Sequence, residues 1–199
     1  MTLPLGHFAD MFAHTDDPWS FRTRFYEERK RALTLAALDK PLFQSVYEPG
    51  CANGELSATL APRCKALLVS DGVEKAVALA RRRLAAFPHV RVERHHVPSE
   101  WPNETFDGIV LSEIGYFLSF IDVVALFDRA TRSLREGGSL VLCHWRRPIE
   151  GCELTGDDVH RLFAATTAFR RLVTHVEEDF LLDVWSVGGP SVGTREGLK

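Results

Sequence analysis

The sequence has neither an excess of basic residues nor a long apolar run. Its 199 residues include 24 lysines and arginines against 27 aspartates and glutamates, so the formal net charge is -3. Proteins that bind nucleic acid usually present a basic surface, and a membrane span needs about 18 apolar residues in a row. The chain also begins without the basic segment and apolar core of a secretory signal. We therefore expect a cytoplasmic protein that acts on a small molecule, with no nucleic-acid or membrane partner.

Cysteine is scarce, and its spacing gives no disulfide or metal pattern. The four cysteines, at positions 51, 64, 143 and 152, form no C-x-x-C pair and no zinc-finger spacing. His95 and His96 are adjacent at the end of a β-prone run, so their side chains point to opposite faces and make poor joint ligands. We expect no metal site.

The G-x-G-x-x-G fingerprint of dinucleotide-binding proteins is also missing. A β-prone run at residues 45–47 is followed by a loop that begins with Gly50, but Ala52 and Glu55 occupy the second and third glycine positions. A pyrophosphate therefore fits poorly, which disfavours a nucleotide-dependent oxidoreductase. Glu48, just ahead of the loop, would repel a phosphate and attract the ammonium and sulfonium of S-adenosylmethionine.

A carboxylate at the end of the next β-prone run completes the pattern. Residues 66–70 lead into Asp71, which stands 21 positions after Gly50. A carboxylate at the tip of a second strand can accept hydrogen bonds from both ribose hydroxyls. The spacing predicts a ligand of the adenosine type.

The pattern E-x-G-x-x-x-G over residues 48–54, followed by Asp71, resembles motifs I and II of class I S-adenosylmethionine-dependent methyltransferases. Residues 106–113 look like that family's fourth strand, and residues 134–141 like its Gly-Gly turn and fifth strand. The resemblance covers roughly residues 20–188. Glu48-Pro49-Gly50-Cys51, taken with the segment Ser112-Glu113-Ile114-Gly115-Tyr116-Phe117-Leu118, most resembles the branch of nodulation protein S (NodS)-like N-methyltransferases.

The resemblance implies a Rossmann-like α/β fold, in which a mostly parallel sheet of seven strands, ordered 3-2-1-4-5-7-6, is flanked by helices. We expect an N-terminal arm or lid without regular period at residues 1–20, the methyltransferase domain at 21–188, and a flexible tail at 189–199. Periodicity predicts helices near 22–38, 55–61, 73–84 and 123–134, a third strand at 90–94, a fifth strand at 139–145, and a hairpin of 169–175 with 180–187.

The helix before the first strand is expected to close over the cofactor. In residues 22–38, Phe25 and Leu35 lie near one face, which predicts that Glu27 and Lys30 are solvated. Tyr26 and Arg29 are three residues apart and share a face. Arg29 is thus a candidate clamp for the methionine carboxylate, with an ordinary surface arginine as the alternative.

The remaining cofactor contacts are implied by the resemblance. The third strand of the family usually ends in an acid that bonds to adenine. Here His96 stands at that position, and Val97 can offer its backbone N–H. The full set of expected S-adenosylmethionine-binding residues is Tyr26, Arg29, Glu48, Gly50, Cys51, Ala52, Gly54, Asp71, Gly72, His96, Val97 and Ser112.

Catalytic candidates follow the fourth and fifth predicted strands. Ligands of open α/β sheets bind beyond the carboxyl ends of the strands, and Glu113 and Tyr116 follow the apolar run 106–111. We expect Glu113 to orient an acceptor amine, and Tyr116 to donate a hydrogen bond or shape the pocket. His144, on the same rim, is a candidate for acid-base work, with a satisfied structural histidine as the alternative.

The resemblance implies a methyltransferase that acts on an amine of a small molecule, such as an amino sugar or a related metabolite. Two alternatives remain open at this stage: an O-methyltransferase of a small metabolite, and a non-catalytic subunit that only binds S-adenosylmethionine. Sequence does not fix the oligomeric state, for which a homodimer is one option.

Overall fold

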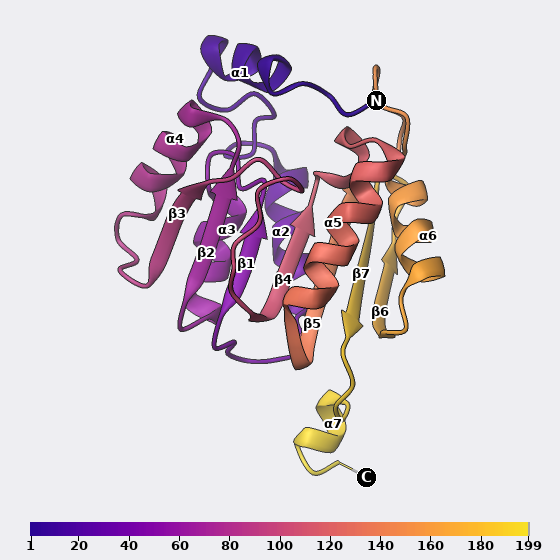
Figure 1. Cartoon of the computed structure of the whole chain (residues 1–199). Helices are drawn as coiled ribbons and strands as arrows, with labels where there is room; N and C mark the ends of the chain where they lie inside the picture. Colours follow the sequence, from indigo (N-terminus) through magenta and orange to yellow (C-terminus); the bar gives the residue numbers. More distant parts are fainter. Residues whose placement is uncertain (199) are drawn as a thin grey trace.

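Seven strands pair into one sheet in the order β3-β2-β1-β4-β5-β7-β6 (Figure 1). β1 to β5 are mutually parallel, whereas β7 runs antiparallel to both β5 and β6. The Rossmann-like order expected for the chain is confirmed in this computed structural model, which describes residues 1–198. The strands are β1 (Val46–Pro49), β2 (Leu67–Asp71), β3 (Val90–Arg94), β4 (Phe106–Ser112), β5 (Leu134–Trp145), β6 (Arg170–Val176) and β7 (Phe180–Ser186).

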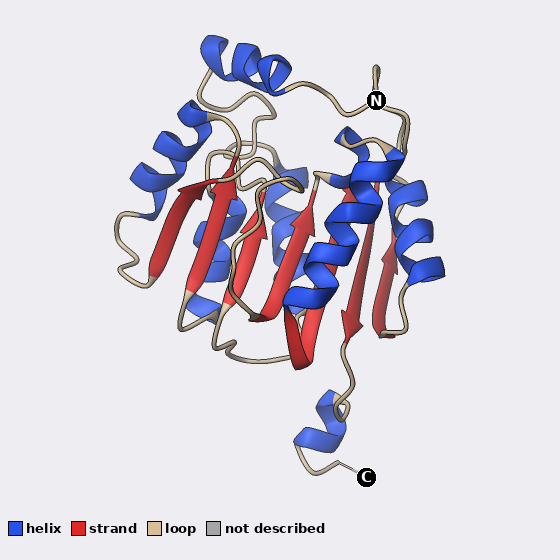
Figure 2. Ribbon diagram, viewed as in Figure 1, coloured by secondary structure: helices blue, strands red, loops and turns tan. Residues whose placement is uncertain are grey.

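Helices cover both faces of the sheet (Figure 2). Alternate residues of the central strand β4 enter two different apolar cores, because successive strand residues point to opposite faces. Val110 packs in one core with Val46, and Ile109 and Leu111 pack in the other. The helices are α1 (Leu5–His14), α2 (Phe25–Ala37), α3 (Glu55–Leu60), α4 (Glu74–Leu84), α5 (Phe120–Ser133), α6 (Gly156–Thr166) and α7 (Val192–Arg195), with short 3-10 turns η1 (Ala61–Arg63) and η2 (Gly115–Phe117).

The N-terminal arm contains a helix that its sequence did not predict. α1 lies above the carboxyl ends of the strands (Figure 1), and its Phe12 is buried against α4. The extended segment before α1 is bound to the turn η2, which follows β4, since Leu3 N–H donates to the Phe117 carbonyl at 2.8 Å. The arm therefore spans the edge of the sheet where parallel strands end.

One boundary prediction and one orientation prediction were wrong. α5 ends at Ser133 and β5 begins at Leu134, so Gly137-Gly138 lies inside the strand and does not terminate the helix. The orientation of α2 is also different from the expected one. Phe25 is 74% exposed, whereas Glu27 and Lys30 are 7% and 5% exposed, because the face of this helix that carries the two charged residues packs over a cavity.

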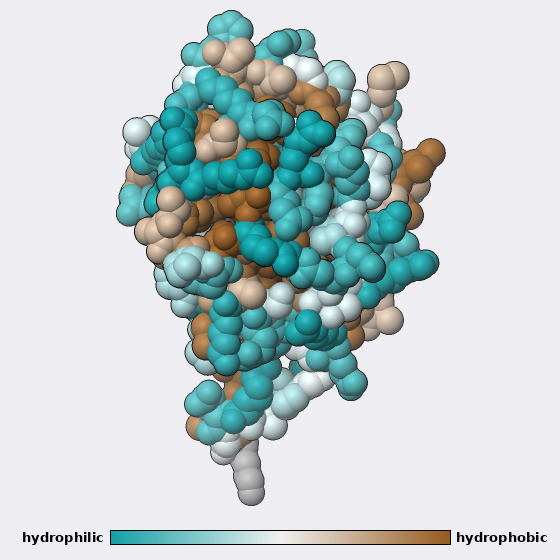
Figure 3. All heavy atoms as spheres, turned by 60° about the vertical axis from the view of Figure 1, so that its left-hand side comes forward, coloured by the Kyte–Doolittle hydropathy of each residue, from teal (hydrophilic) through white to brown (hydrophobic). Residues whose placement is uncertain are grey.

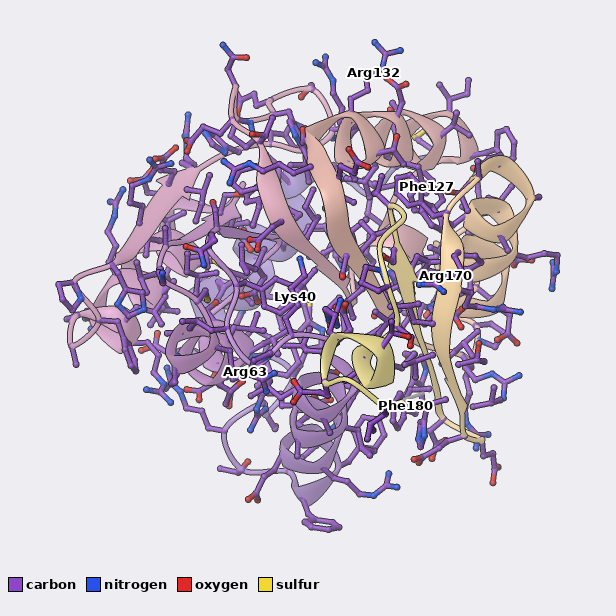
Figure 4. All side chains as sticks on the ribbon, turned by 90° about the horizontal axis from the view of Figure 1, so that it is seen from below. Lys40, Arg63, Phe127, Arg132, Arg170 and Phe180 are labelled. Carbon is purple, nitrogen blue, oxygen red and sulfur yellow. The ribbon has the colours of Figure 1, made fainter. Side chains whose placement is uncertain are left out.

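The C-terminal tail carries the short helix α7, where we expected no regular structure. Arg195 donates to Asp39 Oδ2 at 3.0 Å, which ties the tail to the loop after α2. Figure 4, which views the sheet from below, shows α7 beside Lys40, far from the edge that carries α1. Lys199 lies outside the described residues. No helix within residues 1–198 is long and apolar enough to cross a membrane.

Candidate functional site

A cavity of about 740 Å³ lies at the carboxyl ends of β1, β2 and β4, beneath α1. On the side of the molecule shown in Figure 3, apolar side chains are visible in a hollow among hydrophilic ones. The cavity gathers most of the residues that the sequence predicted for the site: Tyr26, Glu48, Gly50, Cys51, Ala52, Asp71, Gly72, His96, Val97, Ser112, Glu113 and Tyr116.

The turn between β1 and α3 needs its glycines. Gly50 has φ +74°, and a Cβ there would lie 2.2 Å from Ile114 Cγ2. Gly54, the N-cap of α3, has φ +82° and lies outside the residues that line the cavity. Cys51 N–H donates to the Ser70 carbonyl at 2.9 Å, so the turn is fixed to the end of β2.

Glu48 is a buried acid with an unused acceptor. Its exposed fraction is 3%, and its Oε2 atom has no hydrogen-bond partner within the described part of the chain. Burial raises the pKa of this carboxyl to about 8. A buried carboxylate oxygen without a donor is costly, so Glu48 is suited to receive a cation or an N–H group from a ligand.

Asp71, the last residue of β2, binds the same turn. Its Oδ2 accepts from Ala52 N–H at 3.0 Å and its Oδ1 from Val73 N–H at 2.9 Å. Burial raises the pKa of this carboxyl above its usual value. Because a carboxylate has about four acceptor positions, two remain for ligand hydroxyls.

The loop after β3 supplies a third wall of the cavity. His96 and Val97 both line it, and His96 N–H donates to Glu100 Oε2 at 2.7 Å. Gly72, which follows Asp71, faces Leu5 of α1, and a Cβ at Gly72 would lie 2.6 Å from Leu5 Cδ2. The arm thus packs directly on the end of β2.

Glu113 holds the centre of the rim. It has φ +59°, which is uncommon for a residue with a side chain. Its Oε1 accepts from Lys30 Nζ at 2.9 Å, and its Oε2 accepts from Tyr116 Oη and from Trp145 N–H at 3.2 Å. Tyr116 is therefore a hydrogen-bond donor to Glu113, in addition to forming part of the wall.

Sequence reasoning missed several charged residues of the cavity, among them Glu27 and Lys30. Lys30 forms ion pairs with Glu27 at 3.0 Å and with Glu113 at 2.9 Å. Burial alone would lower the pKa of Lys30, but the two carboxylates raise it above its usual value. The spacing of Glu27, Lys30 and the buried Thr34 at i, i+3 and i+7 is a helical face and was the available signal.

The two residues expected to share a face of α2 are separated by the structure. Tyr26 lines the cavity, and its buried hydroxyl has no partner within residues 1–198. Arg29 lies outside the cavity lining and pairs with Glu177 on the hairpin at 2.7 Å. Arg24 and Arg31, at other positions of the same segment, do line the cavity.

His144 lies near the carboxyl end of β5, as the sequence predicted, but it does not line the cavity. It is 0% exposed, and its Nε2 accepts from Gly115 N–H at 3.1 Å. Burial, with the neighbouring His160, holds the pKa of His144 well below its usual value. Its acceptor nitrogen is already occupied, so this geometry favours the structural alternative over the acid-base role that we expected.

Comparisons with known proteins agree on one family. A family model, Nodulation protein S (NodS), matches residues 10–153. Nodulation protein S of Rhizobium tropici is 33% identical over 128 residues, which are 63% of this chain and 54% of the relative. The relative from Sinorhizobium fredii is 32% identical, with 56% of this chain and 51% of the relative covered. The matched part therefore spans about half the length of these relatives.

Solved structures show the same fold. A Pseudomonas syringae protein, described as a candidate methyltransferase, is 48% identical with a TM-score of 0.74, over 82% of this chain and 99% of its own. The N-methyltransferase NodS of Bradyrhizobium japonicum WM9, in complex with S-adenosyl-l-homocysteine, is 24% identical with a TM-score of 0.81, over 90% and 96% of the two chains. Since the family model matches most of the sequence, the chain belongs to the nodulation protein S (NodS) family.

Proposed function

We propose that this chain is an S-adenosylmethionine-dependent methyltransferase that methylates an amine of a small molecule. The observation that carries the proposal is Glu48, a buried acid beside a glycine turn, with one oxygen that lacks a partner among residues 1–198 and with a place in the cavity wall. A buried anion is stable only when a cation or donors satisfy it. The ammonium of S-adenosylmethionine is a cation of the required size and charge.

The rest of the wall fits the same molecule. Asp71 has two free acceptor positions, which we assign to the ribose hydroxyls, and we assign the loop with His96 and Val97, which lines the cavity, to adenine. We assign the binding of the methionine carboxylate to Arg31 and no longer to Arg29. Arg31 lines the cavity and donates one hydrogen bond, to the Phe21 carbonyl, so its other N–H groups can bind a carboxylate. When bound, this cofactor supplies an electrophilic methyl group on sulfur.

Glu113 is the residue we assign to the acceptor. It receives hydrogen bonds from Lys30, Tyr116 and Trp145 N–H. A carboxylate offers about four acceptor positions, so one remains for an N–H of the acceptor. One of these donors is the Lys30 ammonium, which forms an ion pair with Glu113. Glu113 therefore orients the amine and does not remove its proton.

This geometry favours an amine over a hydroxyl as acceptor. An alcohol is a weak nucleophile until a base removes its proton, whereas the nitrogen of a neutral amine can attack without prior loss of a proton. Glu113 is held by three donors, and His144 lies outside the cavity. The NodS of Bradyrhizobium japonicum is described as an N-methyltransferase. Whether the amine belongs to an amino sugar stays a prediction.

The test begins with the cofactor. Calorimetry with S-adenosylhomocysteine is expected to show one site per chain, and Glu48→Gln is expected to weaken binding while Glu28→Gln, an exposed residue on α2, does not. A wild-type protein that binds neither this molecule nor S-adenosylmethionine would remove the proposal.

Turnover is tested with a panel of amine and hydroxyl acceptors, by mass spectrometry of the methylated product. We expect methylated amines, and a large loss of kcat for Glu113→Gln with unchanged cofactor affinity. Methylated hydroxyls would point to an O-methyltransferase. Tight binding without any product would support the non-catalytic subunit.

Partner and location are proposed on charge and on the same cavity. The net charge of -3 gives no basic surface for nucleic acid, so we infer a small metabolite as partner and the cytoplasm as location. Light scattering of the purified chain distinguishes a monomer from the homodimer left open by the sequence.

A further inference from the structure

Three buried side chains form a hydrogen-bonded chain behind the cavity. His144 Nδ1 lies 3.1 Å from His160 Nε2, and His160 Nδ1 lies 2.7 Å from Asp183 Oδ2. The three residues come from β5, α6 and β7, and their exposed fractions are 0%, 3% and 2%. This hydrogen-bond network ends at the backbone of η2, where Gly115 N–H donates to His144 Nε2 at 3.1 Å.

These contacts determine where each proton lies. A backbone N–H can only donate, so His144 Nε2 is an acceptor and the proton of a neutral ring must sit on Nδ1. That proton is donated to His160 Nε2, which places the proton of His160 on Nδ1, facing Asp183. Asp183 also accepts from Thr174 Oγ1 at 2.7 Å, and Arg171 Nη1 lies 3.9 Å from it, which favours an ionised carboxylate. Each ring nitrogen of His144 and His160 is therefore either a donor or an acceptor, and not both.

The loop that His144 reaches is the one that carries Glu113 and Tyr116. β5 holds this loop at three successive residues: Glu113 N–H donates to the Cys143 carbonyl at 2.9 Å, Gly115 N–H donates to His144, and Trp145 N–H donates to Glu113 Oε2. The His144 ring also contacts the Tyr116 ring edge-on, with centroids 5.5 Å apart. The middle contact is the one that depends on a side chain of β5 and on its tautomer.

We propose that His160 and Asp183 are positioning residues for methyl transfer. They fix the tautomer of His144, and His144 then holds the Gly115 backbone so that Glu113 and Tyr116 face the acceptor. No hydrogen bond joins Glu113 or Tyr116 to either histidine in the described chain, so the network orients the loop and does not conduct the acceptor proton. The inference rests on the proposed function.

Two substitutions at one position separate orientation from simple packing. His160→Leu fills the site but removes the acceptor for the Nδ1 proton of His144. His160→Gln keeps an oxygen able to accept that proton. We expect kcat to fall about 10- to 100-fold in His160→Leu, because small displacements of positioned groups have effects of this order. Cofactor affinity should stay unchanged, and His160→Gln should recover most of kcat. Arg161→Gln, an exposed neighbour on α6, is the control.

A wild-type kcat in His160→Leu would overturn the proposal, as would an equal loss in the Leu and Gln variants. Should His160→Leu fail to fold, nitrogen-15 NMR of the wild-type protein decides. A proton on His144 Nδ1 supports the proposal, and a proton on Nε2 overturns it. The NMR measurement needs no turnover, so it is independent of the acceptor screen that tests the proposed function.

Discussion

Lys30 on α2 donates a hydrogen bond of 2.9 Å to Glu113, a residue 83 positions away in the loop after β4. The same ammonium is paired with Glu27 and lies 4.9 Å from the centre of the Tyr26 ring. One buried cation therefore joins the helix that precedes the sheet to the rim of the cavity. α2 is consequently part of the cavity wall, in addition to covering the sheet.

Replacing Lys30 by Met is expected to destabilise the protein by about 3 kcal/mol, because removing one partner of a buried ion pair leaves uncompensated charge. Urea unfolding of the ligand-free protein measures the change. Lys65→Met, at an exposed position, is the matched control. Adding Glu27→Gln to Lys30→Met should recover part of the lost free energy of unfolding. A loss of under about 1 kcal/mol in Lys30→Met, as expected for a surface ion pair, would contradict the buried network.

Binding of S-adenosylhomocysteine should depend on pH through Glu48. Below its pKa of about 8 this carboxyl is protonated in the free protein, and an ammonium ligand favours the ionised form. Binding then releases a proton, so affinity rises as pH increases from 6 toward 8, by at most about tenfold per pH unit, and levels off above the pKa. Calorimetry in buffers of different ionisation enthalpy measures the released proton. Glu48→Gln should lose the proton release, and an unchanged slope in that variant would assign the effect elsewhere.

Gly50→Ala should destabilise the turn for two reasons. Its φ of +74° costs about 1–2 kcal/mol for a residue with a Cβ, and the new atom would lie 2.2 Å from Ile114 Cγ2. The double variant Gly50→Ala, Ile114→Ala removes the collision but keeps the backbone cost. Thermal unfolding of the four proteins in this cycle should show favourable coupling between the two substitutions. Strict additivity would mean that the turn relaxes without contact with Ile114.

Arg31→Ala should weaken cofactor binding, whereas Arg29→Ala should leave it unchanged. Arg31 lines the cavity, and Arg29 is bound to Glu177 on an exposed surface, where an ion pair contributes about 0–1 kcal/mol. The loss of a charge-assisted bond suggests about a 10-fold higher Kd for Arg31→Ala. Calorimetry on both variants checks this, and the reverse order would restore the assignment made from the sequence alone.

From the sequence, the sheet order followed from the resemblance to class I methyltransferases, and the glycine turn with its two acids followed from local spacing. Glu48, Gly50 and Asp71 are set by local spacing, because the residue that ends a strand and the residue that starts the next helix meet the same edge of a parallel sheet. The structure brings all three to one cavity, as expected. Such positions can be inferred without knowing how distant segments pack.

Only the tertiary structure decided which charged residues of α2 enter the site and what His144 does. Apolar periodicity assigned Glu27 and Lys30 to solvent, but both are buried beside a cavity, where Lys30 pairs with Glu27 and Glu113, so the rule that apolar residues face inward fails there. The sequence places His144 near the end of the fifth strand, but its hydrogen-bond network with His160 and Asp183 involves α6 and β7. The role of a side chain depends on the groups that it contacts. Because His160 and Asp183 are remote from His144 along the chain, only the fold decides that they lie within hydrogen-bond distance.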